Sequence, residues 1–288
     1  MKLKPLLQKT PLRRLFDTSP VVTVLPLYGV IAPGGGKLRG EHLNLAGLAE
    51  QIEKAFSAKH LAAVALAVNS PGGSPVQSAL IFDRIRQLAE EKDVPVYAFA
   101  EDVMASGGYW LALAADEIYV NKSSIIGSIG VVSAGFGFPA LLDKLGVDRR
   151  IYTAGENKVK LDAFSPEKAE DVEWLEKIQG DIHDTFKDVV KARRGERLKK
   201  RKDKELFSGD VWIGDKAVDL GLVDGIGDIR SFCRARFGEK VRFNRIEGKQ
   251  GFLARKLGLG AGGTAASDAV AAMIETLQSR SLWGRFGL

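Results

Sequence analysis

The feature that most constrains the fold is a unit of apolar strand, glycine-containing turn and helix that recurs along the first half of the chain. The apolar strand patterns at 21–32 and 61–73 are each followed by helical spacing of apolar residues, at 43–57 and 75–91, and 94–116 repeats the unit. Continuous apolar strands that alternate with helices are typical of parallel sheets covered on both faces. We therefore predict an α/β fold with a mainly parallel sheet and crossover helices. Active sites of such sheets lie where strands end and helices begin.

A serine occupies one of these junctions. The stretch VPVYAFAEDVMASGGYWLALAAD at 94–116 places Ser106 between a strand and a helix. Gly107 and Gly108 leave the backbone bare, and the first N–H groups of the helix can face developing negative charge. The arrangement follows the logic of a nucleophile elbow, although GxSxG is absent. Alternatively, Ser106 is only the N-cap of the helix, which is the commoner role of such a serine.

Other candidate site residues lie in later turns and loops. In NSPGG at 69–73, the glycines are turn residues, or the N–H of Gly73 supports an oxyanion opposite the serine. Ser128 stands where a purely structural segment would favour a larger side chain. Lys158 and Lys160 lie in a polar loop, ENKVKLDAFSP, where lysines are ordinarily solvated.

The second half of the chain predicts more helix than strand. We expect a helix at 139–145, a short strand at 148–155, charged helix over 166–204, and a strand, helix and glycine-rich stop over 208–228. Within the charged helix, an apolar stripe indicates core or interface packing; it consists of Val172, Trp174, Leu175 and Ile178.

We divide the chain into a basic N-terminal arm (1–19), a main domain (20–237), and a C-terminal glycine-rich linker with an amphipathic helical tail (238–288). The net charge of +6 comes from basic runs, which indicate solvated faces rather than a nucleic-acid site. Each terminus is a candidate for peripheral membrane contact or, by preference, for packing on a partner subunit. We read no signal peptide or transmembrane segment and expect a cytoplasmic protein, either free or peripheral on the inner membrane face.

Several catalytic classes lack their motifs. The histidines fall in predicted helices or at their edges, so none suits a Ser-His-Asp triad, and neither metal-ligand spacing nor a phosphate-binding loop occurs. A single cysteine rules out a disulfide framework within the chain. A nucleophilic serine would need another base, and a lysine made neutral by burial can serve.

The ordered motifs resemble one family of enzymes. They are NSPGG at 69–73, ASGGYW at 105–110, GSIGV at 127–131, TAGENK at 153–158 and GDVWIGDKAVDLGLVD at 209–224. Together they are similar to the signal peptide peptidase A and SohB family of serine peptidases, over about residues 20 to 230. The resemblance implies a Clp protease/crotonase-like fold of repeated ββα-type units.

The resemblance also implies roles for individual residues. Ser106 matches the nucleophile, Lys158 the general base, and Ser128 the serine that hydrogen-bonds the lysine; Lys160 competes for the position of the base. Gly73 matches an oxyanion-hole glycine, and Gly107 is expected to supply the second N–H. Relatives need no metal, nucleotide or organic cofactor, and they form rings in which neighbouring subunits complete each site.

The resulting hypothesis is a homo-oligomeric Ser-Lys endopeptidase. Its expected substrates are short apolar or unfolded peptides, such as remnants of signal peptides. One alternative is an acyl-CoA hydratase or isomerase of the crotonase group, which would use the oxyanion-hole glycines but not the serines and the lysine. The other alternative is an inactive, ring-forming scaffold.

Overall fold

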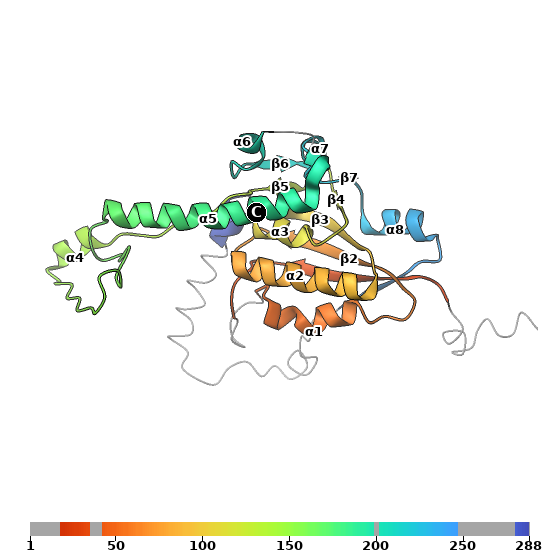
Figure 1. Ribbon diagram of the computed structural model, residues 1–288, viewed down its shortest axis with the longest axis horizontal. Helices are drawn as coiled ribbons and strands as arrows, with labels where there is room; N and C mark the ends of the chain where they lie inside the picture. Colours follow the sequence, from red (N-terminus) through yellow and green to blue (C-terminus); the bar gives the residue numbers. More distant parts are fainter. Residues whose placement is uncertain (1–17, 35–41, 199–201, 247–279, 288) are drawn as a thin grey trace, which may run out of the picture.

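The fold is built on one twisted sheet (Figure 1). The structure, a computed structural model, describes residues 18–34, 42–198, 202–246 and 280–287. In the described residues the sheet has eight strands: β1 (Val21–Tyr28), β2 (Leu61–Ser70), β3 (Val96–Ala105), β4 (Glu117–Val120), β5 (Ile125–Gly127), β6 (Val211–Ile213), β7 (Gly225–Ile226) and β8 (Arg242–Arg245). Their order is β6-β5-β3-β2-β1-β8, with β4 between β3 and β7. Every pairing is parallel except that of β5 with β6, which confirms the α/β class and the mainly parallel sheet.

Helices cover both faces of this sheet. They are α1 (Leu45–Ala55), α2 (Pro75–Lys92), α3 (Gly107–Ala112), α4 (Pro139–Leu145), α5 (Ala169–Arg194), α6 (Asp203–Leu206), α7 (Gly214–Asp219) and α8 (Ile229–Phe237), with a 3₁₀ turn at Gly195–Leu198. Helices α1, α2 and α3 pack on one face, and α8 packs on the other (Figure 1). Successive side chains of a strand point to opposite faces of the sheet. In β2, Val64 and Leu66 pack in the core beneath α1, α2 and α3, and Ala63 and Ala65 pack in the core beneath α8.

The helices begin where the sequence supplies caps. Asn44 Oδ1 accepts a hydrogen bond from Gly47 N at 2.9 Å at the start of α1. Ser74 caps α2 through Gln77 N at 3.4 Å, and Pro75 occupies the first turn, where its missing N–H costs nothing. These caps fix the starts of two crossover helices at the end of the sheet to which the strands point.

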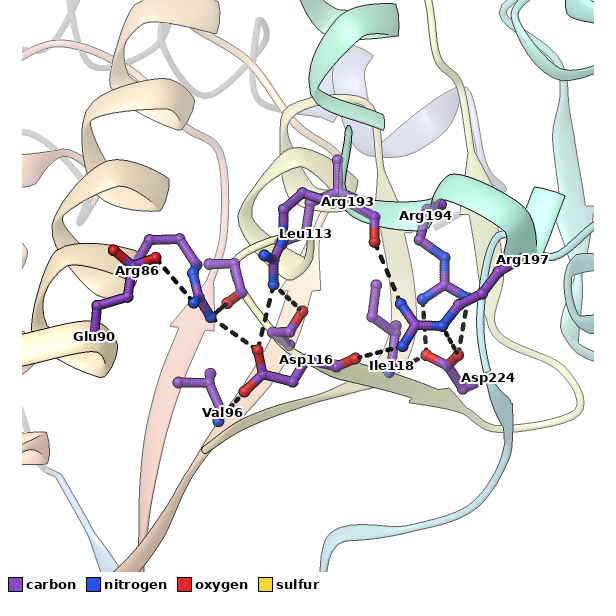
Figure 2. A network of polar contacts seen from close by, with 12 residues as sticks. Arg86, Glu90, Val96, Leu113, Asp116, Ile118, Arg193, Arg194, Arg197 and Asp224 are labelled. Atoms are coloured by element: carbon purple, nitrogen blue, oxygen red, sulfur yellow. Dashed lines mark hydrogen bonds and ion pairs between the residues drawn. The ribbon is translucent and has the colours of Figure 1, made fainter. Parts of the chain in front are cut away.

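The C-terminal end of α5 is fastened to the sheet by two arginine–aspartate groups (Figure 2). Arg193 donates to the carbonyls of Leu113 and Ala115 at 2.8 and 3.0 Å, at the C-terminal end of α3. Arg86 of α2 and Arg193 also pair with Asp116, at 2.9 and 3.4 Å. This first group therefore joins α2, α3 and α5 at one carboxylate.

The second group is more deeply buried. Arg194, whose side chain is 2% exposed, forms a two-pronged pair with Asp224 at 2.8 and 3.1 Å and donates to Gly221 O at 2.9 Å. The same carboxylate accepts from the backbone N–H of Ile118 at 2.7 Å, at the start of β4. Asp224 thus connects the end of α5 to the sheet, with Arg197 as a third, more exposed partner at 3.3 Å.

Residues 131–168 extend from the sheet to the N-terminal end of α5 and include α4 (Figure 1). We call this segment the arm; it is distinct from the basic N-terminal arm at 1–19. Arg149 pairs with Asp162 and lies over the ring of Phe164, which stacks on Phe138 at 5.4 Å. The predicted helix at 139–145 is confirmed, but the predicted strand at 148–155 is wrong. The arm lies away from the sheet, and no strand within the described residues pairs with this segment, so its backbone has no ladder to join.

The two ends of the chain are described only in part. Residues 1–17 of the predicted basic arm lie outside the described residues, as does the predicted glycine-rich break. Strand β8 pairs with β1 and extends the sheet past residue 237. Part of the predicted tail, residues 280–284, is helical. None of the helices in the described ranges is both long and apolar enough to cross a membrane.

Candidate active site

Ser106 lies at a sharp turn between β3 and α3, as the sequence predicted. Its backbone angles, φ 51° and ψ −123°, are strained for a residue with a side chain. Ser106 occupies the N-cap position of α3, but its hydroxyl makes no capping hydrogen bond to that helix. The turn is held by Ser106 N donating to Gly127 O at 2.7 Å and Trp110 N donating to Ser106 O at 3.0 Å. The strain therefore orients a hydroxyl that has no structural partner among the described residues.

The glycines of the two predicted turns interlock. A Cβ at Gly72 (φ +99°) would lie 2.7 Å from Gly107 N, and a Cβ at Gly73 (φ +142°) would lie 2.0 Å from Ile31 O. A Cβ at Gly107 would lie 3.3 Å from Gly73 N. The two predicted oxyanion-hole residues are therefore neighbours. Neither N–H has a backbone partner outside the regular helices and strands of the described chain, which leaves both available to an anion.

Ser128 follows β5 and also has a positive φ, of 51°. Its N–H donates to Asp210 O at 2.7 Å, and the residue is 5% exposed. Gly127, just before it, has φ +110°, and a Cβ there would lie 2.6 Å from the ring of Trp212. Because Ser106 N bonds Gly127 O, the two serine turns are joined directly.

One pocket of about 610 Å³ brings these groups together. Ser106, Ser128, Gly73 and Gly107 all contribute to its lining. Its remaining walls are largely apolar and come from α3, α5 and the loops after β2 and β5; they include Trp110, Val132, Leu175, Ile178, Ile182 and Phe186. Trp110 stacks on Phe186 at 4.7 Å and joins α3 to α5 behind the pocket.

The structure does not bring the lysines to this pocket. Lys158 and Lys160 are both in the arm and neither lines the pocket. Lys160 pairs with Asp171 at 3.5 Å and lies over the ring of Trp174. Lys158 is exposed, and no hydrogen bond or ion pair of its ammonium group is found among the described residues. The described chain thus presents a nucleophile site without a base and an unpaired lysine away from it.

Sequence reasoning missed part of the pocket wall. The stripe assigned to core or interface contributes Leu175 and Ile178 to the pocket, while Trp174 is 43% exposed. The spacing of apolar residues on α5 was visible, but it does not reveal whether the partner surface is a core or a cavity. His183, on the same helix, bonds Ile129 O through Nε2 at 3.1 Å and so supports the loop that carries Ser128.

Proteins similar in sequence to this chain include two named as a peptidase or protease and one named as an antiporter. A Brucella abortus (strain 2308) protein named Na(+)/H(+) antiporter NhaA is 50% identical over 98% of this chain, which covers 39% of that protein. A putative signal peptide peptidase SppA of Enterococcus faecium is 32% identical over 72% of this chain and 60% of its own length. The putative protease slr0021 of Synechocystis is 31% identical over 71% of this chain and 75% of its own length. The chain therefore spans less than two thirds of the first two relatives.

A solved structure of the 1510-N membrane-bound stomatin-specific protease is similar to 80% of this chain and 98% of its own, at 14% identity and a TM-score of 0.48. The sequence profile of peptidase family S49 matches residues 88–236, which include the turns of Ser106 and Ser128 and the arm. Since this match covers more than half of the chain, the protein belongs to peptidase family S49.

Proposed function

We propose that the chain is a serine endopeptidase in which Ser106 is the nucleophile and the N–H groups of Gly73 and Gly107 form the oxyanion hole. The observation that carries the proposal is the strained backbone of Ser106, which holds an unpartnered hydroxyl beside two available N–H groups. Such strain persists only where the surrounding structure maintains it, and it is concentrated at functional sites. An acyl-CoA hydratase would use the two N–H groups but would not need this serine.

We propose that the general base is Lys158 of a second copy of the chain. Lys158 does not line the pocket that contains Ser106 of the same chain, which supports a base supplied by a second subunit. The arm exposes large apolar side chains that a monomer leaves in water; they are Val132, Phe136, Leu141, Leu145, Val147 and Tyr152. Burying them against a neighbour would favour a homo-oligomer, for which a ring is the expected form. Lys160 is already paired within its own arm, which favours Lys158.

In the proposed reaction, neutral Lys158 accepts the proton of Ser106 Oγ as the oxygen attacks a peptide carbonyl. The N–H groups of Gly73 and Gly107 bind the oxyanion of the tetrahedral intermediate. The lysine then gives its proton to the leaving amine, and an acyl-enzyme remains. A water molecule, deprotonated by the same lysine, releases the acid and regenerates the serine. Ser128 orients the lysine amine beside the nucleophile.

The pocket supports apolar peptides as substrates. Its walls of Leu175, Ile178 and Ile182 would bury apolar side chains, with about 25 cal/mol for each Å² removed from water. Remnants of signal peptides fit this chemistry, and the Enterococcus relative is named a signal peptide peptidase. Placement in the cytoplasm and membrane contact of the N-terminal arm remain predictions from the sequence.

Subunit complementation tests the dyad and the assembly together. Ser106→Ala and Lys158→Ala should each abolish hydrolysis of a fluorogenic leucyl peptide, while Lys160→Ala should retain it. If the base comes from a neighbour, mixing the two inactive proteins should restore activity. A Lys158→Ala subunit would then supply the serine, and a Ser106→Ala subunit the lysine.

Three results would count against the proposal. Robust activity of Lys158→Ala would place the base elsewhere, and failure of complementation in verified mixed oligomers would place both groups in one subunit. A wild-type oligomer that neither hydrolyses peptides nor is acylated at Ser106 by a serine-directed probe would favour the scaffold alternative.

A further inference from the structure

The C-terminal segment 280–287, which we call the tail, contacts the pocket that holds Ser106. Leu282 and Arg285 belong to the same pocket lining as Ser106 and Ser128. In Figure 1 the C-terminus lies beside α3 and α5, the two helices that form the pocket walls. The tail therefore occupies space beside the nucleophile.

The tail is suited to an apolar pocket. Leu282, Trp283 and Phe286 are half-buried, whereas Ser281, Gly284 and Arg285 are exposed. The apolar side chains thus face the protein, and Leu282 meets the pocket formed in part by α5. The contact uses the type of surface that the proposed peptide substrates would use.

The backbone of the tail is not in the form of an extended substrate. Residues 280–284 are helical, and the turn that follows is closed by Phe286 N donating to Trp283 O at 2.9 Å and Gly287 N donating to Gly284 O at 3.1 Å. An extended peptide that joins a sheet edge offers its main-chain groups to that edge. In the tail, main-chain groups are bonded internally, so the tail borders the pocket without presenting an extended segment for cleavage.

We propose that the tail is a tethered, uncleaved ligand of the Ser106 pocket of its own chain and competes there with peptide substrates. The described chain stops at residue 246 and resumes at 280. At about 3.3–3.6 Å for each residue, a connection of this length reaches about 110 Å when extended, which is ample for its own pocket. Tethering provides an effective concentration on the order of 1 mM, so even a weak contact is occupied.

Two full-length variants and one truncation test the inference, whose kinetic readout rests on the proposed function. Leu282→Asn alters a pocket contact, and Ser281→Asn introduces the same side chain one residue away, at an exposed position. The third protein ends at residue 279. The measurement is the rate of Ser106 acylation by a leucyl-peptide fluorophosphonate. With a tail affinity of about 0.1–1 mM, the truncated protein and Leu282→Asn should react about two- to ten-fold faster than wild type.

Ser281→Asn should match wild type, and a synthetic peptide of residues 280–288 should slow the truncated protein competitively. Equal rates in all proteins would overturn the inference, as would equal acceleration by the two asparagine variants. If no protein is acylated, the proposed function fails, and acrylamide quenching of Trp283 decides the position of the tail. The quenching of Trp283 is obtained by subtracting the fluorescence of the Trp283→Phe form of each protein from that of the protein itself. Greater quenching in Leu282→Asn than in Ser281→Asn supports the contact, and equal quenching overturns it.

Discussion

Replacement of Gly107 by alanine separates the stability of the active-site turn from its chemistry. A Cβ at this position would lie 2.5 Å from Ser78 Oγ, 3.1 Å from Ile31 Cδ1 and 3.3 Å from Gly73 N. Ser78 Oγ cannot move freely because it donates to Ser74 O at 2.9 Å. We expect Gly107→Ala to lower the free energy of unfolding by about 1–3 kcal/mol, the usual cost of overpacking a filled site.

Addition of Ser78→Ala removes the atom that the new methyl group meets first. Alone, this change should cost about 0.5–1.5 kcal/mol for the lost hydrogen bond. In the double variant, the nearest remaining atoms are the flexible end of Ile31 and the nitrogen of Gly73. The double variant should therefore lose less unfolding free energy than the two single variants lose in sum, by about 1 kcal/mol or more. Activity should not return, because the methyl group remains beside the Gly73 N–H, and loss of an oxyanion donor lowers kcat by about 10²–10³.

The assay compares urea unfolding and leucyl-peptide hydrolysis for wild type, the two single variants and the double variant. Recovery of wild-type kcat in the stabilised double variant would refute the oxyanion hole assigned to Gly73 and Gly107. Strictly additive losses of stability would refute the contact with Ser78 on which the design depends.

Three further predictions concern the surroundings of the site. Arg194→Met leaves the carboxylate of Asp224 without its buried partner, so it should lower the free energy of unfolding by about 3 kcal/mol in urea titrations. Adding Asp224→Leu to the same chain should recover part of that loss. Burial raises the pKa of Cys233 from 9.0 to about 12, so the folded state holds this proton more tightly than the unfolded state. The contribution of Cys233 to stability is therefore complete below pH 9 and is lost between pH 9 and 12. The free energy of unfolding should fall by at most about 1.4 kcal/mol for each pH unit in this range. Urea unfolding of Cys233→Ala over this range should show a shallower decline, and an unchanged slope would contradict this account. His183→Ala removes the donor to Ile129 O and should lower kcat about five-fold with little change in KM, whereas His183→Gln, which retains an N–H, should keep most of the activity.

The sequence was most informative where the backbone itself requires a residue type. Gly72 and Gly73 have positive φ angles and leave no room for a Cβ, and the sequence indicated the turn that they form. Strand β2 and the first half of β3 were predicted because a parallel strand covered on both faces reads as a nearly continuous apolar run. The turn of Ser106 follows from the same local signals.

Segments that depend on distant partners were predicted less well. The short segment 148–155 is compatible with a strand and with a loop, and only an available sheet edge decides between them. The apolar side of α5 gave no sign that Leu175 and Ile178 line a cavity. The approach of Leu282 to the same cavity could not be predicted, because local pattern does not specify which surface a distant helical turn will contact.

Helix α5 links the three properties on which the proposed peptidase depends. It has 26 residues, and at 1.5 Å for each residue it is about 39 Å long. Its C-terminal end is fastened by Arg194 to the sheet, its middle lines the pocket, and its N-terminal end meets the arm that contains Lys158. The arm begins at the pocket wall with Val132, but it holds Lys158 outside the pocket lining of the same chain. On the proposed mechanism, a separated subunit therefore keeps its nucleophile turn but lacks its base, and peptide hydrolysis should disappear on dilution below the dissociation constant of the oligomer.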